Sequence, residues 1–262
     1  MPALALSLAL TLWGCSGKPS AVTKLEKLGA IVTIDKESPD KAVLAVDLKR
    51  ADLTDADLEH LEGFTKLQSL NLMHTDVTDA GLAHLKGLTT LQVLDLRETK
   101  VTDVEILHVL SQLQSLSLWG TDVTDDGLKG ITRLTSLQSL NLRETKITDA
   151  GLEHLKSLLQ LTTLRLGYTP ITDAGLTYLK GLTKLQFLDL THTNVTGAGL
   201  VHLKGLPNLR SLYLFGGTIT EAGLDQLRGL TTLELLDLGK TNVTDESVNK
   251  LRQALPNCTI EH

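Results

Sequence analysis

The sequence predicts an α/β solenoid with a parallel β-sheet on its concave face and helices on its convex face. Two observations support this fold class. One is a repeat of 24 residues that fills most of the 262-residue chain, and the other is the apolar spacing within each repeat. A fixed period of 20–50 residues is typical of stacked supersecondary units. Because one unit cannot bury its apolar face alone, the units must stack on each other.

A threonine after each apolar stretch marks the period. It recurs every 24 residues, except for a step of 22 residues between Thr99 and Thr121. Ala51 and Gly217 take its place in the first and eighth units, so the chain has nine units. The full set is Ala51, Thr75, Thr99, Thr121, Thr145, Thr169, Thr193, Gly217 and Thr241.

Each unit contains the pattern of one strand followed by that of one helix. The LxL pattern, as in Leu70-Asn71-Leu72, has the period of two expected of a strand, and the later leucines have helical spacing. The helix is expected after Thr78-Asp79, because short oxygen-bearing side chains cap first-turn N–H groups and an acidic residue suits the positive end of the helix dipole. We therefore assign the acidic column to capping rather than to cation binding. It comprises Asp55, Asp79, Asp103, Asp125, Asp149, Asp173, Glu221 and Asp245.

The threonine column also has a structural explanation. The chain turns inward after each strand, and an unpaired buried polar group costs about 1–3 kcal/mol. We expect the Thr hydroxyl to pair with such backbone groups, and Gly217 to leave the turn of the eighth unit weaker. The shorter third unit, Val101 to Gln112, predicts a shortened helix, which we interpret as a tolerated deletion.

The repeat LxxLxLxxTxVTDAGLxHLKGLTx resembles the leucine-rich-repeat family, whose units run 20–29 residues. The TDAGL segment is similar to the subclass with a true helix on the convex side. F-box adaptors of that subclass carry Cys or Asn where this chain has Thr, and there is no room for an F-box before the repeats. The adaptor function is therefore not expected. The resemblance is greatest to bacterial proteins built almost wholly of such units.

We divide the chain into four segments. Residues 1–14 are a signal-like segment, and residues 15–20 are a short linker. Residues 21–41 form an N-terminal cap, with a helix over 22–28 and a strand over 31–34. Residues 42–262 hold the nine repeats, which end in a helix over 246–255 and a strand over 258–260 that cover the last unit.

The N-terminal segment indicates export. Ala3 to Trp13 is apolar but too short to cross a bilayer, which takes about 20 helical residues. Leu12-Trp13-Gly14-Cys15 resembles the lipobox of bacterial lipoproteins, which implies lipidation of Cys15 and a cell-envelope location, periplasmic or on the outer surface. Trp13 is bulky for its place and no Lys or Arg precedes it. An unprocessed N-terminus and a cytoplasmic protein therefore remain the alternative, and Met1 need not be the true start.

Several functions are not expected. The net charge of −6 argues against nucleic-acid binding, which requires a surface rich in Lys and Arg. Motifs of hydrolases, nucleotide-binding proteins and metalloproteases are absent, so we expect no catalytic residue and no cofactor. The only other cysteine, Cys258, is expected to be an inert buried thiol. A histidine column suggests a metal array, but neighbouring helices stand too far apart for convergent ligands, and no metal site is expected. It comprises His60, His84, His108, His154 and His202.

The candidate binding residues lie where the repeats differ. In each strand the leucines point inward, so the alternate residues face the concave side in three columns. Trp119 is expected between Arg97 and Arg143, and exposed aromatic and Arg side chains are enriched at binding hot spots. A second group lies toward the C-terminus, with Tyr168 at the strand edge. The candidate site is Arg97, Trp119, Arg143, Arg165, Phe187, Asp189, Tyr213 and Phe215.

These columns predict a monomeric, non-enzymatic scaffold that binds a protein or peptide on its concave face. Contact with a membrane is expected only through the lipid anchor. One alternative is a glycan- or cell-wall-associated module, which aromatic residues would also suit. Another is a structural spacer, in which the Arg residues merely stack on Trp119 and the other aromatics have no role.

Overall fold

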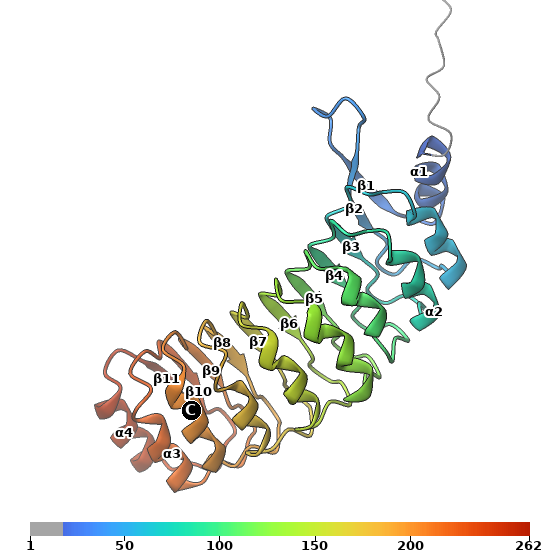
Figure 1. Cartoon of the computed structure of the whole chain (residues 1–262). Helices are drawn as coiled ribbons and strands as arrows, with labels where there is room; N and C mark the ends of the chain where they lie inside the picture. Colours follow the sequence, from blue (N-terminus) through green and yellow to red (C-terminus); the bar gives the residue numbers. More distant parts are fainter. Residues whose placement is uncertain (1–17) are drawn as a thin grey trace, which may run out of the picture.

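A computed structural model describes residues 18–262, which form one curved array of stacked units (Figure 1). The predicted signal-like segment and Cys15 lie outside the described residues. Eleven strands make a single sheet in sequence order. β1 pairs antiparallel with β2, and the pairs that follow are parallel, as in β3 with β4. The predicted solenoid with a parallel sheet is confirmed.

The strands stack in constant register, so that each column of a unit lies beside the same column of the next. Leu70 of β3 is opposite Leu94 of β4, which is opposite Leu116 of β5. The strands are β1 (Ile31–Ile34), β2 (Val43–Asp47), β3 (Ser69–Asn71), β4 (Val93–Asp95), β5 (Ser115–Ser117), β6 (Ser139–Asn141), β7 (Thr163–Arg165), β8 (Phe187–Asp189), β9 (Ser211–Tyr213), β10 (Leu235–Asp237) and β11 (Thr259–Glu261).

Helices cover the other side of each unit (Figure 1), but most are 3-10 helices rather than the true α-helices that the resemblance implies. A 3-10 helix rises about 2.0 Å per residue against 1.5 Å for an α-helix, so it crosses the unit with fewer residues. The helices are α1 (Lys18–Lys27), η1 (Asp55–Leu61), α2 (Asp79–Leu82), η2 (Ala83–Leu85), η3 (Glu105–Val109), η4 (Asp126–Arg133), η5 (Gly151–Ser157), η6 (Gly175–Leu179), η7 (Ala198–Gly205), α3 (Glu221–Leu227) and α4 (Asp245–Ala254).

The N-terminal end of the leucine core is covered by α1 and β1. α1 begins at Lys18, earlier than the sequence pattern predicts, and buries Leu25 completely against the core. β1 extends the sheet by pairing with β2, and the connection between them projects beyond the array (Figure 1). At the other end, α4 and β11 occupy the positions expected of the final helix and strand, each within one residue.

The threonine column has the predicted role. Each Thr hydroxyl donates to the carbonyl oxygen three residues earlier, as from Thr75 to Leu72 at 2.7 Å and from Thr145 to Leu142 at 2.7 Å. The same bond recurs in five further units. Gly217 has no hydroxyl, and only its backbone N–H bonds the Leu214 carbonyl, at 3.1 Å. The eighth turn therefore lacks one buried hydrogen bond, as the sequence predicts.

The acidic column does more than cap helices, and here the sequence interpretation is wrong. Asp55 accepts from the backbone N–H of Thr78 in the next unit at 2.8 Å, and from its hydroxyl at 2.6 Å. Thr78, not Asp79, is the residue whose oxygen accepts from the first turn of its own helix. The same two bonds link Asp149 to Thr172. These Asp–Thr clasps therefore join neighbouring units, and others start at Asp79, Asp125 and Asp173.

The clasp explains the glycine of the TDAG sequence. A Cβ at Gly175 would stand 2.3 Å from Oδ1 of Asp149, and one at Gly81 would stand 2.4 Å from Oδ1 of Asp55. The carboxylate thus occupies the volume that a larger residue would need. In the first unit, which has no preceding repeat, Asp57 takes the glycine position and its own carboxylate bonds Thr54. The Thr54 N–H is the main cause of the lowered pKa of Asp57.

The clasp is interrupted where the repeat is irregular. In the shortened third unit, Asp103 instead accepts from the N–H of Glu105 at 2.6 Å. The helix of the next unit lies unusually close to the helix of this short unit, since a Cβ at Gly130 would lie 2.4 Å from the Glu105 Cα. This close approach explains why Gly130 replaces the histidine of that column. A second interruption falls at Gly197, where the Thr220 N–H bonds the Thr196 carbonyl at 2.8 Å instead.

We expect Gly175→Ala to lower the free energy of unfolding by about 1–3 kcal/mol, because its methyl group would overlap the Asp149 carboxylate. Gly181→Ala in the same unit is the matched control: it meets nothing within 4 Å and should change stability by less than about 0.5 kcal/mol. Urea unfolding measures both. The loss of stability caused by Gly175→Ala should be smaller in a chain that also carries Asp149→Ala, because the clashing carboxylate is then absent. If the losses caused by the two substitutions simply add, the Asp–Thr clasp does not explain the glycine.

Candidate binding face

The concave side of the sheet carries the candidate site, as the alternation of burial shows. In β3, β5, β6 and β9 the middle Leu is buried, while the residues on either side are half-buried and face away from the core. Three columns of side chains therefore run across the array. The middle column begins with Asp47 and Asn71, and the last column, just beyond each strand, begins with Lys49 and Met73.

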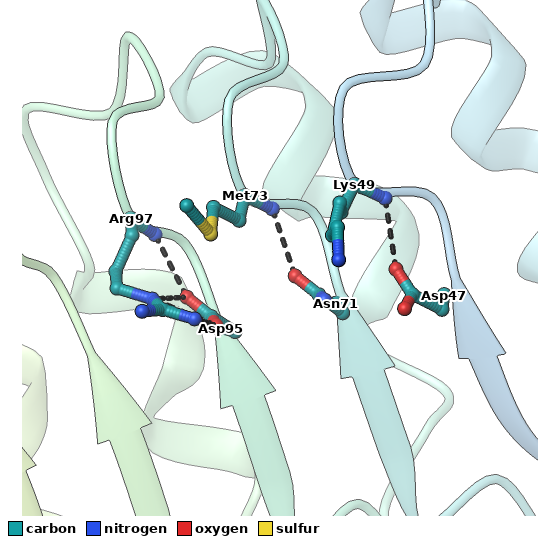
Figure 2. A network of polar contacts seen from close by, with 6 residues as sticks. All are labelled: Asp47, Lys49, Asn71, Met73, Asp95 and Arg97. Atoms are coloured by element: carbon teal, nitrogen blue, oxygen red, sulfur yellow. Dashed lines mark hydrogen bonds and ion pairs between the residues drawn. The ribbon is translucent and has the colours of Figure 1, made fainter.

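Most of the middle column has a structural role that the sequence analysis missed. Figure 2 shows it in the first three units: the side-chain oxygens of Asp47, Asn71 and Asp95 accept from the backbone N–H two residues later. The distances are 3.0, 3.0 and 3.1 Å. Asn141, Asp189 and Asp237 make the same bond in later units. This local bond is the ordinary turn-forming use of Asp and Asn.

Three middle-column residues depart from this rule. They are Ser117, Arg165 and Tyr213, in the fourth, sixth and eighth units. The backbone N–H groups of Trp119, Gly167 and Phe215 therefore lack the acceptor that the other six units supply. These are positions where the chain gives up a stabilising turn contact, and so they are candidates for selection by function.

Trp119 is only partly placed as predicted. The Arg97 guanidinium lies 6.0 Å from its ring centroid, at the outer limit of a cation–π contact. Arg97 is held by Asp95, with Nη2 to Oδ2 at 2.6 Å, and this hydrogen bond is the main cause of the raised pKa of Arg97. Arg143 lies over Tyr168 instead, 4.5 Å from its ring centroid. The expected sandwich of Trp119 between two arginines is therefore wrong.

Two polar atoms of the fourth unit have no hydrogen-bond partner. Ser117 Oγ and Trp119 Nε1 are both covered from solvent, and they are the only such side-chain atoms found within residues 18–262. Leaving a buried donor unpaired costs about 1–3 kcal/mol. Because both atoms belong to the concave side of one unit, the cost is concentrated at one place on the candidate face.

A continuous row of rings and cations, which we name the edge ladder, runs along the end of the strands. It consists of Arg143, Tyr168, His192, Phe215 and Lys240. The Tyr168 and His192 centroids are 4.6 Å apart, and those of His192 and Phe215 are 5.6 Å apart. Lys240 Nζ lies 5.3 Å from the Phe215 centroid. Sequence reasoning missed His192 and Lys240 because their column is not one of the three strand columns.

Three residues of the edge ladder have a left-handed backbone conformation. Tyr168, His192 and Lys240 have φ of 58°, 51° and 54°, and the same position is left-handed in all nine units. This conformation costs a residue other than glycine roughly 1–2 kcal/mol. Glycine occupies the position at Gly216, where a Cβ would lie 2.2 Å from the His192 ring. Gly216 thus leaves room for the imidazole, while Tyr168 occupies the same position of the sixth unit despite the backbone cost.

A second set, the face cluster, lies on the strands themselves and consists of Arg165, Phe187 and Tyr213. The Arg165 guanidinium lies 4.7 Å from the Phe187 centroid, and the Phe187 and Tyr213 centroids are 5.1 Å apart. Neighbouring parallel strands bring these residues together because they lie about 4.8 Å apart. The structure thus brings together three of the residues that the sequence singled out.

Asp189 has a supporting position rather than an exposed one. It is 6% exposed, accepts from the Thr191 N–H at 2.9 Å, and lies 3.6 Å from Arg143 Nη1. Asp189 therefore holds the backbone at the end of β8 and contacts Arg143, the first residue of the edge ladder. A ligand cannot reach it without displacing its neighbours.

The other chemical candidates have ordinary surroundings. Across residues 18–262, no group of three or more His, Cys, Asp or Glu side chains could hold a metal ion. In the histidine column, His84 pairs with Glu62 at 2.7 Å. Burial raises the pKa of the half-buried Cys258 thiol, which disfavours the reactive thiolate. In the same part of the chain, no helix is both long and apolar enough to cross a membrane.

Comparison with known proteins agrees with this architecture. Leucine-rich-repeat family models match residues 65–85, 133–156 and 159–219. Internalin C2 from Listeria monocytogenes superposes with a TM-score of 0.66 and 23% identity, over 83% of this chain and 92% of that one. A second Listeria monocytogenes internalin has a TM-score of 0.52 and 20% identity, over 92% and 94% of the two chains. A search of curated proteins by sequence gave no match.

The repeat geometry and these matches define the class of fold: the chain is a leucine-rich-repeat solenoid, and leucine-rich-repeat family models match part of it. The identity to the two internalins is low, so what they share with this chain is the fold.

The role of the middle column gives a reciprocal prediction. Ser117→Asn should supply the missing acceptor to Trp119 N–H and raise the free energy of unfolding by about 0.5–1.5 kcal/mol. Asn141→Ser should lower it by a similar amount, since the Arg143 N–H loses its partner. Urea unfolding of the two variants tests this. Changes of the same sign would show that the side-chain acceptor is not what stabilises these turns.

Proposed function

We propose that this leucine-rich-repeat protein is a non-enzymatic scaffold that binds a protein or peptide on its concave face. The observation that carries the proposal is the position of the edge ladder and the face cluster. Both gather aromatic and cationic side chains on the concave side, and the face cluster holds Arg165 and Tyr213, two of the three residues that depart from the turn rule of the middle column. Aromatic and Arg side chains are the types enriched at protein-binding hot spots.

The stacking pattern favours a protein partner over a carbohydrate. A sugar ring binds against a free aromatic face. Tyr168 already has Arg143 on one side along the array and His192 on the other. Phe187 likewise lies between Arg165 and Tyr213. Tyr168 and Phe187 therefore present mainly their ring edges and the neighbouring cations, which suits contact with peptide carbonyls and apolar side chains.

A spacer without a partner does not account for the same features. A purely structural array gains stability from each Asp or Asn in the middle column, and it has no use for the unpaired atoms of Ser117 and Trp119. These costs fall on the concave side, where a partner can offset them.

The proposed location is the cell envelope, with a lipid on Cys15 as the anchor and a monomeric repeat array beyond it. The support is the lipobox-like sequence Leu12-Trp13-Gly14-Cys15. Mass spectrometry of the mature N-terminus tests this proposal. An acylated Cys15 is expected, whereas an unmodified Met1 would place the protein in the cytoplasm.

The binding proposal is tested with Tyr213→Ala combined with Phe215→Ala, which removes one ring from each set. The experiment is to immobilise the protein on beads and to capture proteins from an envelope extract of the source cells. The double variant should lose the specifically captured partner, because the interface loses its aromatic anchors. Tyr178→Ala is the matched control, since this ring packs against Lys156 on a convex helix. Equal capture by the wild-type chain and the double variant would contradict the proposal.

A further inference from the structure

A hollow lies at the centre of the concave face, between the N-terminal units and the face cluster. It has a volume of about 220 Å³ and spans strands β4 to β7. Small side chains form its floor, and an arginine stands on either side. Its polar lining comprises Arg97, Ser115, Ser117, Ser139, Asn141 and Arg165, with Asp95 beside Arg97.

Apart from the serine hydroxyls, which can donate or accept, the free polar groups of this hollow are donors. The side-chain oxygens of Asp95 and Asn141 are already engaged: Asp95 holds Arg97, and the Asn141 oxygen accepts from the Arg143 N–H at 3.1 Å. Arg165 packs its guanidinium against Phe187, and it has no carboxylate within ion-pair distance anywhere in residues 18–262. Ser117 Oγ is unpaired beneath the same hollow. The hollow therefore carries one uncompensated positive charge and a hydroxyl without a partner.

We propose that this hollow binds the carboxylate of a Glu or Asp side chain on an extended peptide segment of the partner. The inference rests on the proposed function and adds the chemistry of the ligand. Arg165 forms the ion pair, Ser117 donates its hydroxyl after a covering side chain moves, and the Asn141 amide is positioned to donate. A hydrogen bond between charged groups is about twice as strong as a neutral one.

The charge balance selects a monoanion. Arg97 is neutralised by Asp95, so Arg165 is the only unpaired cation of the lining. A phosphate or sulfate dianion would lie near the Asp95 carboxylate with one cation to offset its charge. A carboxylate matches the single charge, and repulsion from Asp95 is then smaller.

The face cluster fixes what lies beside the acidic residue. Tyr213 on β9 is two strands from Arg165 on β7, a distance of about 10 Å at 4.8 Å per strand. An extended peptide rises about 3.3 Å per residue, so this separation is about three residues. The expected ligand pattern is an acidic residue with an aromatic or aliphatic residue three positions away.

The experiment is selection of a random peptide display library on the immobilised full chain. The wild type should enrich peptides with Glu or Asp about three positions from an apolar residue. A selected peptide should bind at least tenfold more weakly when its acidic residue becomes Gln or Asn, and when the protein carries Arg165→Gln. Arg133→Gln, on the convex helix η4, is the matched control and should bind as the wild type does.

A second variant distinguishes loss of binding from loss of folding. Ser117→Asp places a carboxylate in the hollow and also restores the turn acceptor, so it should be at least as stable as the wild type and yet lose the acidic peptides. Peptides that depend on Tyr213 and Phe215 but show no acidic preference would overturn this inference and leave the proposed function standing. Enrichment of no peptide would contradict both, and so would binding only of an anionic oligosaccharide tested in parallel.

Discussion

Stacking of units at a single strand spacing is the constraint on which the rest of the structure depends. Every unit must present to its neighbours the same leucine layer and the same backbone groups. The Thr hydroxyl pairs the inward carbonyl within a unit, and the Asp–Thr clasp joins one unit to the next. The clasp in turn requires a glycine beneath the carboxylate. Three recurring residue types therefore follow from one geometric requirement.

The same constraint identifies the candidate binding face. A column that is repeated for structural reasons carries little information about a ligand, and the middle column shows this at its six Asp and Asn positions. The three middle-column residues that are not Asp or Asn lie close together once the sheet is formed. Ser117 and Arg165 border one hollow, and Tyr213 continues the cluster beside it. The concave face is thus divided into turn-forming residues and residues free to bind.

Much of this could be read from the sequence, and the reasons for the failures are physical. The strand, the buried Thr and the unit count follow from local periodicity. The clasp could not be predicted, because its two residues belong to different units and only the stacking register brings Asp55 to Thr78. The partner of Arg143 was also wrong, since a left-handed turn places Tyr168 beside it. A sign was nevertheless available: the middle column is Asp or Asn in six units, and Ser117, Arg165 and Tyr213 stand out as exceptions.

The division between turn-forming and binding residues is tested most directly by substituting Ala at each of the nine middle-column positions and measuring both the free energy of unfolding and peptide binding. At the six Asp and Asn positions, we expect a loss of about 1 kcal/mol in stability, because a backbone N–H loses its acceptor. At Ser117, Arg165 and Tyr213, binding should fall while stability changes less. Equal losses of stability at all nine positions, with binding unchanged at those three, would contradict the account.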